Sequence, residues 1–205
     1  MGFYDTCRGD LFHPGGFELT KRAIEYCGLK QGAVLADIGC GTGGSARLIA
    51  ENYPFTVLGV EPSAAMAGGN PEIINASVEK MPFATAFLDC ALCECVLSLC
   101  DDITAAINEL GRVIKPSGHL ILSDVYSKSM RFSAAGAIKW LYTRQDFFSF
   151  LADCGFEVVL CEDHSRELAN MIAMHILNGE NCGSYVFDGI DKKNIGYLLI
   201  IAQKR

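Results

Sequence analysis

The chain has 205 residues, of which 50% are hydrophobic and 20% are charged, and its formal net charge is −7. This composition excludes a disordered chain, and the length fits one domain with a sizeable core. The acidic balance argues against nucleic acid as a partner, because phosphate binding depends on clustered lysine and arginine. No apolar run approaches the roughly 20 residues of a membrane span, and the N-terminus lacks the apolar core of a signal peptide. We therefore expect a cytoplasmic protein, monomeric or homodimeric, with mostly reduced cysteines, no membrane partner and a small-molecule substrate.

Strand-like and helix-like segments alternate along the chain, which predicts an α/β domain built around a parallel sheet. The predicted strands cover residues 33–38, 56–60, 73–76, 88–93, 119–123, 156–161 and 197–202. The predicted helices follow a glycine-rich turn to about residue 52 and cover residues 102–114, 143–155 and 165–180. Thr143 and Asp146 have the spacing of a capping box. Ser63 is placed to cap a short helix that Gly68 and Gly69 end early.

A glycine-rich turn, Gly39 to Gly44, follows the first predicted strand and precedes a helix. Such a turn lets backbone N–H groups approach a ligand closely. Glu61 ends the next strand, about 20 positions after the first glycine, where a carboxylate can accept hydrogen bonds from both hydroxyls of a ribose. Together these features predict an adenosine-containing cofactor at the carboxyl ends of the strands.

Two cofactors fit this turn. Gly39, Gly41 and Gly44 satisfy the dinucleotide pattern GxGxxG, which would indicate an NAD-type oxidoreductase, although the pattern alone is weak. Asp37 lies two residues before the first glycine, and its carboxylate would repel a pyrophosphate. The same carboxylate suits the ammonium group of a methionine moiety, and an acidic pocket also favours a sulfonium cation. The residues therefore favour S-adenosylmethionine, with the oxidoreductase as an alternative.

Four segments resemble motifs of the class I S-adenosylmethionine-dependent methyltransferases, in the type 11 branch of ubiquinone/menaquinone-biosynthesis-like enzymes. They are residues 36–43, residues 59–63, the loop 79–83 and the turn 112–118. The resemblance implies a Rossmann-like, doubly wound sheet of seven strands, mostly parallel, with the last strand antiparallel. It also implies that S-adenosyl-L-methionine is bound by Asp37, Gly39, Cys40, Gly41, Thr42, Gly43, Glu61, Pro62, Ser77, Val78, Glu94 and Cys95.

Ser77 departs from the family pattern, in which an aspartate at this position binds the adenine amino group. The serine hydroxyl still accepts a hydrogen bond, but more weakly, and the glycine-broken segment after Glu61 predicts a looser wall for the adenine pocket. Together with the lack of an evident general base, Ser77 supports a further alternative, a non-catalytic S-adenosylmethionine-binding protein.

Cys90, Cys93, Cys95 and Cys100 lie on and just after the fourth predicted strand. Around Cys95 and residues 123–126 the sequence is similar to arsenite methyltransferases, which hold As(III) with cysteine thiolates. An arsenite or metalloid methyltransferase is therefore an alternative function. Cysteine also fills central strands as a small apolar side chain, and the two thiols of a CxxC segment in a strand point to opposite faces. We expect structural cysteines and no metal site.

The methyl acceptor is expected beyond the fourth and fifth strands. The candidate substrate residues are His13, Asp124, Tyr126 and His164, and the candidate catalytic residues are Tyr126, His164 and Cys95. None of them is a clear general base, and the sulfonium is already activated, so positioning and desolvation could supply most of the acceleration. The expected reaction is methyl transfer to an N, O, C or S atom of an unidentified small molecule.

Residues 1–205 are expected to form a single methyltransferase domain. Residues 1–30 are expected to form an N-terminal cap segment, because such a segment often folds over the cofactor in the family that the chain resembles. Residues 165–194 form a helical insertion before the last strand, and a connection that long is usually functional or disordered. Its apolar stripe fits a lid over the acceptor pocket, and it fits a helix packed on the sheet equally well.

Overall fold

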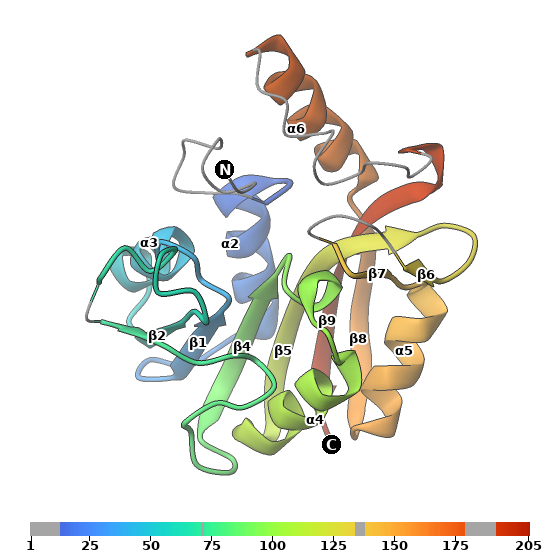
Figure 1. The fold of residues 1–205 in the computed structure, drawn as a ribbon. Coiled ribbons are helices and arrows are strands. Elements are labelled where there is room, and N and C mark those ends of the chain that lie inside the picture. The colour runs from blue at the N-terminus through green and yellow to red at the C-terminus, as the bar shows by residue number, and fades with distance from the viewer. Residues whose placement is uncertain (1–12, 71, 134–137, 179–191) are drawn as a thin grey trace.

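A central sheet of seven strands organises the computed structural model, which describes residues 13–70, 72–133, 138–178 and 192–205 (Figure 1). The strands are β1 (Val34–Ile38), β2 (Thr56–Val60), β3 (Ile73–Ile74), β4 (Leu88–Glu94), β5 (Ile114–Ser127), β8 (Phe156–Asp163) and β9 (Ile195–Lys204). Their order across the sheet is β3-β2-β1-β4-β5-β9-β8. β9 is antiparallel to both of its neighbours, whereas the pairs from β3 to β5 are parallel. The expected doubly wound α/β fold with an antiparallel last strand is confirmed.

Helices cover both faces of this sheet (Figure 1). They are α2 (Gly16–Cys27), α3 (Gly44–Asn52), α4 (Ile103–Val113), α5 (Arg144–Asp153) and α6 (Ser165–Leu177), with short 3-10 turns η1 (Leu97–Leu99) and η2 (Lys192–Asn194). Apolar side chains of α2, α3 and the first turns of α6 pack on one face of the sheet, and those of α4 and α5 pack on the other. This two-sided burial explains why the strands are apolar without strict alternation.

Side chains of β4 alternate between the two cores. Cys90 and Leu92 pack on the α2 side, whereas Ala91 and Cys93 pack on the α4 side, and all four are completely buried. The two thiols of the CxxC segment therefore lie on opposite faces of the sheet, as the strand period predicts.

Helix α2 spans the sheet from its centre to its far edge. Arg22 forms an ion pair with Glu162 of β8, and Tyr26 donates a hydrogen bond to the carbonyl of Val159, also on β8, at 3.1 Å. Thr20 of the same helix reaches the end of β4. Side chains of α2 thus form hydrogen bonds with the end of β4 and with the edge strand β8.

Most predicted elements are confirmed, and the differences have physical causes. The capping box of Thr143 and Asp146 is present at the start of α5. β5 is longer than predicted at both ends, because the chain passes from α4 straight into the strand and the strand keeps pairing with β9 as far as Ser127. The short helix expected after Ser63 is wrong: residues 64–69 form successive turns, although Ser63 does accept the amide of Met66 at 3.3 Å.

Two small elements were not predicted. β6 (Phe132–Ser133) and β7 (Trp140–Leu141) form a two-residue antiparallel ladder beyond the end of β5.

α6 ends at Leu177, before the predicted end at residue 180. The remainder of the predicted insertion to residue 191, like residues 1–12 of the predicted cap segment, lies outside the described residues. Within the described residues, no helix is long and apolar enough to cross a membrane.

Candidate cofactor and acceptor site

The glycine turn after β1 takes a backbone path that only glycine adopts without strain. Gly39 has φ +72° and Gly43, which caps α3, has φ +82°. A Cβ on Gly39 would also lie 2.6 Å from Cγ2 of Val96. The amides of Gly39 and Cys40 both bond to the carbonyl of Val60, at 2.7 and 3.0 Å, which fixes the turn against the end of β2. The turn is therefore held open toward the carboxyl edge of the sheet, where ligands bind in doubly wound folds.

Asp37 lies on β1 just before this turn and is almost completely buried. Its Oδ2 has no hydrogen-bond partner within the part of the chain that the structure describes. Burial, together with the charges of Glu94 and Glu61, raises the pKa of this carboxyl to about 8, against one backbone hydrogen bond from Ala46. A buried carboxyl oxygen without a donor is costly, so the geometry suits a cationic ligand group that would supply one.

Glu61 follows β2 and faces the same turn. Its Oε2 accepts the amide of Gly41 at 3.0 Å, and its Oε1 accepts the amide of Ser63 at 2.9 Å. Each oxygen keeps a further lone pair, because an ionised carboxylate offers about four acceptor positions. Glu61 therefore fixes the glycine turn and can still accept hydrogen bonds from a diol.

Glu94 ends β4 beside β1, and its side chain is only 7% exposed. Its Oε1 accepts the hydroxyl of Thr20 at 2.7 Å, and its Oε2 accepts the hydroxyl of Ser45 at 3.3 Å. His13 Nε2 lies 3.3 Å from the same Oε2. Glu94 thus joins α2, α3 and the segment before α2 at one point. Neither Thr20 nor Ser45 was predicted from the sequence.

The predicted adenine side is formed by the loop after β3. Val78 is buried, Ser77 is half-buried, and the amide of Lys80 bonds to the Ser77 carbonyl at 3.2 Å. Arg112 of α4 fixes this loop by donating hydrogen bonds to the carbonyls of Phe83 and Met81, at 2.8 and 3.2 Å. The loop and the turn 112–118, two of the segments that resemble family motifs, therefore meet in space.

The other predicted cofactor residues surround the turn. Cys40 packs against Gly59 of β2, where an added Cβ would be 3.0 Å from its Sγ, and its pKa is raised to about 12 by burial and by the charges of Asp37 and Glu61. Thr42 is exposed at the tip of the turn, and the carbonyl of Pro62 accepts Asn75 Nδ2 at 3.0 Å.

On the predicted acceptor side, Asp124 of β5 and Cys95, which follows β4, are engaged with the protein. Asp124 is completely buried and accepts the amides of Ser98 and Val125, at 2.9 and 2.8 Å, which fixes η1 to β5; burial raises its pKa to about 6. Cys95 has φ +58°, its Sγ lies 3.4 Å from the Tyr197 hydroxyl, and burial raises the pKa of its thiol. Cys95 is thus a half-buried thiol rather than a ready thiolate.

Tyr126 and His164 are directed toward the β8 edge of the sheet. Tyr126 donates its hydroxyl to Asp163 at 2.7 Å, and the Arg144 guanidinium lies 5.7 Å from its ring centroid. His164 caps α6, with Nε2 3.0 Å from Glu162 and Nδ1 3.6 Å from Glu167. The sheet order separates β8 from β1 by three strands, so the structure does not bring these two candidates together with Asp37 and Glu61.

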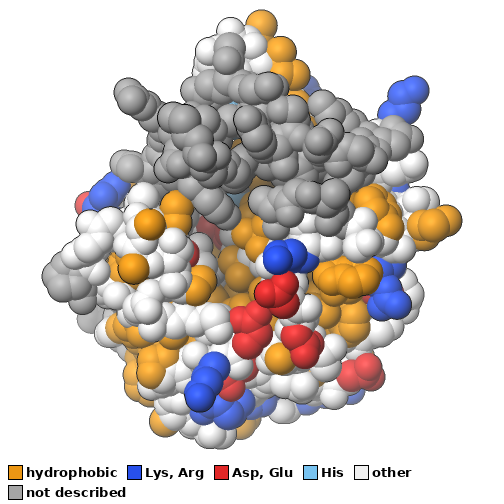
Figure 2. Space-filling model, in the orientation of Figure 1, with side chains coloured by type: hydrophobic (Ala, Val, Ile, Leu, Met, Phe, Trp, Pro, Cys, Tyr) orange, Lys and Arg blue, Asp and Glu red, His pale blue; other side chains and the backbone are white. Residues whose placement is uncertain are grey.

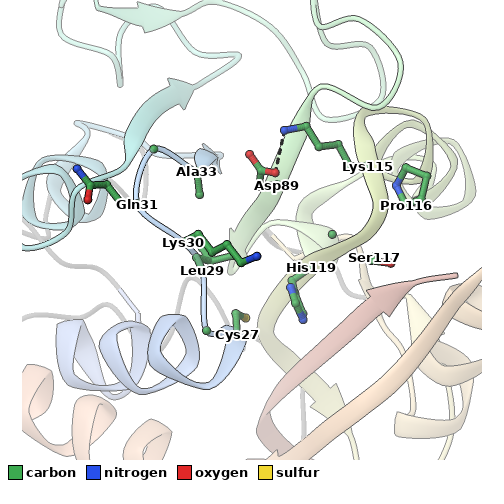
Figure 3. A pocket seen from close by; sticks show the side chains of 13 residues that line it. Cys27, Leu29, Lys30, Gln31, Ala33, Asp89, Lys115, Pro116, Ser117 and His119 are labelled. Atoms are coloured by element: carbon green, nitrogen blue, oxygen red, sulfur yellow. Dashed lines mark hydrogen bonds and ion pairs between the residues drawn. The ribbon is translucent and has the colours of Figure 1, made fainter.

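The surface is hollowed above the carboxyl end of β4, with hydrophobic side chains in the hollow and acidic side chains gathered below it (Figure 2). A second hollow, a groove of about 510 Å³, lies at the opposite end of the sheet, where β1, β4 and β5 begin (Figure 3). There Lys115 points at Asp89 and pairs with it at 2.8 Å. This groove contains none of the predicted site residues.

The cysteines that the structure describes do not gather in one site. Cys90 and Cys93 lie on opposite faces, and Cys95 contacts Tyr197. Among the described residues, no group of three or more His, Cys, Asp and Glu side chains is arranged to hold a metal ion.

Comparisons with known proteins agree on one family. A family model described as a methyltransferase domain matches residues 36–122. The ubiquinone/menaquinone biosynthesis C-methyltransferase UbiE of Klebsiella pneumoniae is 30% identical over 189 residues, which cover 84% of this chain and 72% of that protein. An uncharacterized methyltransferase of Bacillus subtilis, YodH, is 33% identical over 118 residues, which cover 53% of this chain and 50% of that protein. The chain thus spans about half or less of the length of several relatives, down to 35% for phosphoethanolamine N-methyltransferase 1 of Triticum aestivum.

Solved structures share the fold at low sequence identity. The [4+2]-cyclase SpnF has a TM-score of 0.76 and 20% identity, over 97% of this chain and 89% of that chain. Phosphoethanolamine N-methyltransferase 2 of Haemonchus contortus, in complex with S-adenosyl-L-methionine, has a TM-score of 0.76 and 16% identity, over 96% of this chain and 54% of that chain. At such identities the likeness concerns the fold alone.

Proposed function

The chain belongs to the class I S-adenosylmethionine-dependent methyltransferases, and from that premise we propose that it transfers the methyl group of S-adenosylmethionine to a small-molecule acceptor. One observation carries the proposal beyond family membership. Asp37 presents a buried carboxyl oxygen without a partner among the described residues, directly beside the glycine turn. This oxygen lacks a hydrogen-bond donor, which a cationic ligand group would supply.

The residues of this chain suit the parts of the cofactor. Asp37 would accept the α-ammonium group, and Glu61 would accept the ribose hydroxyls with its remaining lone pairs. Val78 would supply an apolar wall for the adenine, and Ser77 a hydrogen-bond acceptor. When bound, S-adenosylmethionine supplies a methyl group that its sulfonium charge has already activated.

No free general base is available among the described candidates, and the proposal needs none. Asp124 is used in fixing η1, the Tyr126 hydroxyl is bonded to Asp163, and the Cys95 thiol has a raised pKa. What the chain supplies is a rigid crevice: the turn is fixed to β2, and Glu94 fixes α2 and α3 to β4. Holding an acceptor in line with the methyl group and excluding water are then the main contributions to rate.

Helix α6 is proposed to border the acceptor pocket. It rises from the β8 end of the sheet on the side of the strands' carboxyl ends (Figure 1). Leu168 in its second turn is buried, whereas Met174, Ile176 and Leu177 near its end are 58%, 62% and 80% exposed. The first turns therefore pack on the sheet, and the exposed apolar tip supports a lid role for the end of the helix.

Calorimetry with S-adenosylmethionine and S-adenosylhomocysteine tests cofactor binding. Replacing Glu61 by alanine removes charge-assisted hydrogen bonds, so affinity should fall about 10- to 100-fold, or roughly 1–3 kcal/mol. Glu157, an exposed carboxylate on β8, is the matched control, and Glu157→Gln should bind as the parent does. Binding of NADH without binding of S-adenosylmethionine would refute the proposal.

Catalysis needs its own test. Transfer of an isotope-labelled methyl group to any member of a panel of small N-, O-, C- and S-nucleophiles would exclude a non-catalytic binding protein. Arsenite belongs in the panel, because its methylation with protection of Cys95 from alkylation would favour the metalloid alternative. Quinone-type and amine acceptors are included because relatives carry names for such reactions.

A further inference from the structure

Asp37 of β1 and Glu94 of β4 lie on neighbouring strands and on the same face of the sheet, because Asp37 pairs with Leu92 and Glu94 follows Leu92 by two residues. The hydrogen-bond donors around the two carboxyl groups differ. Glu94 is held by hydroxyl donors from Thr20 and Ser45, with the His13 ring at 3.3 Å. Asp37 has one backbone donor, the amide of Ala46, and its Oδ2 has none within the described residues. Asp37 therefore has fewer donors, which favours its neutral form.

The groups around Asp37 add negative rather than positive charge. Glu94 acts on it from the end of β4, Glu61 from the end of β2, and the Cys40 thiol from the turn. Helix α3 contributes the Ala46 amide from its first turn. Because Asp37 is almost completely buried and its neighbours are acidic, ionising it without a cationic partner is costly.

We propose that Asp37 and Glu94 form a carboxyl pair that holds one proton, on Asp37, in the free protein, and that the α-ammonium group of the cofactor replaces this proton on binding. The inference rests on the proposed function for the identity of the ligand. The proton leaves Asp37 for solvent as the ammonium arrives, so the charge in the pocket changes little while the orphaned Oδ2 gains a donor. Thr20 and Ser45 are positioning residues, because their hydroxyls hold the Glu94 side chain at the end of β4.

Proton release during binding is directly measurable. Calorimetric titrations with S-adenosylhomocysteine at pH 6.5, in buffers of different ionisation enthalpy, should report about one proton released per ligand bound, since a pKa of about 8 leaves Asp37 almost fully protonated at that pH. The ligand's own ammonium stays protonated under this condition. 5′-Methylthioadenosine, which has the adenosine part but no ammonium, should release none.

Three variants separate the contributions. Asp37→Asn should abolish proton release, and Glu94→Gln should reduce it, because the like charge that holds the proton on Asp37 is gone. Glu61→Gln should weaken binding yet still release a proton, which distinguishes lost affinity from lost protonation. Binding with no proton release by the parent protein at pH 6.5 would overturn the inference while leaving the proposed function intact.

A measurement without ligand covers the case in which the cofactor does not bind. The side-chain carboxyl ¹³C signal of Asp37 in the free protein should remain in the protonated position at pH 6.5 and titrate near pH 8. A signal already ionised at pH 6.5 would refute the carboxyl pair, whatever the outcome for the proposed function.

Discussion

Asp37 should cost the free protein stability at neutral pH, so Asp37→Asn is expected to stabilise it. The folded-state pKa of about 8 lies above the ordinary value of 3.8. A carboxyl whose pKa is raised by folding binds its proton more tightly in the folded state, so the free energy of unfolding falls as pH rises from about 4 and levels off near pH 8. Because pH 7 lies about three units above the unfolded-state pKa, this effect lowers the free energy of unfolding at pH 7 by at most about 4 kcal/mol.

Asparagine has nearly the same shape, can still accept the Ala46 amide, and can donate to Glu94. Urea and thermal unfolding of both proteins without cofactor, from pH 4 to pH 8, should give nearly equal stabilities at pH 4 and a gap that widens with pH. At pH 7 the melting temperature of the variant should be higher by up to roughly 10 °C for a domain of this size.

Asp89 provides a control for which the expected change of stability with pH has the opposite sign. Its pKa is lowered by Lys115 and by the amide of Val34, which outweigh the effect of partial burial. Asp89→Asn should therefore lower stability above about pH 4, where the ionised form contributes. If the unfolding curves of the parent and of Asp37→Asn stay parallel across this pH range, Asp37 does not hold a proton and the reasoning fails.

Three further predictions concern two substitutions and the metal content of the protein. Gly196→Ala should lower the free energy of unfolding by roughly 1–3 kcal/mol in urea titrations, because its Cβ would clash with the Tyr126 ring; unchanged stability would mean that the ring is free to move. Arg112→Ala should lower the free energy of unfolding by about 1–3 kcal/mol, since the carbonyls of Met81 and Phe83 lose their donor. The same variant should bind the cofactor more weakly. An unchanged affinity would mean that the loop 79–83 keeps its conformation without Arg112. Metal analysis of the purified protein should find no stoichiometric zinc, and all ten cysteines should react with a thiol reagent after denaturation; bound zinc would contradict the structural interpretation of the cysteines.

Much of the fold was predictable because each strand leaves a local signal. The seven runs of apolar residues, the turn at Gly39 and the capping box at Thr143 depend on neighbours in sequence. The ends of β5 were missed because they depend on distant partners: Ile114 pairs with Leu88, and Ser127 pairs with Ile195. From its local sequence, a glycine-containing segment such as 115–118 predicts a turn outside the strand, although here the strand continues through it.

The site was predictable where a motif carries it and not where side chains meet by packing. Asp37, Glu61 and the glycines follow from spacing, and the structure brings them together. Thr20 looks like any polar residue of an amphipathic helix, and only the crossing of α2 over β4 brings it to Glu94. Tyr126 was a reasonable candidate by topology, but its ring direction, toward Gly196 and Asp163, cannot be read from the sequence.

The position of β9 has a consequence for synthesis of the chain. It follows every other strand in sequence, yet it lies between β5 and β8, and its first eight residues are buried. Until the ribosome has released this segment, β5 and β8 of the nascent chain have no partner on their facing edges, and unpaired apolar edges invite association with other chains. Folding must therefore finish after translation has passed residue 204, and chains truncated before β9 should be clients of chaperones or proteases rather than folded proteins with a missing tail.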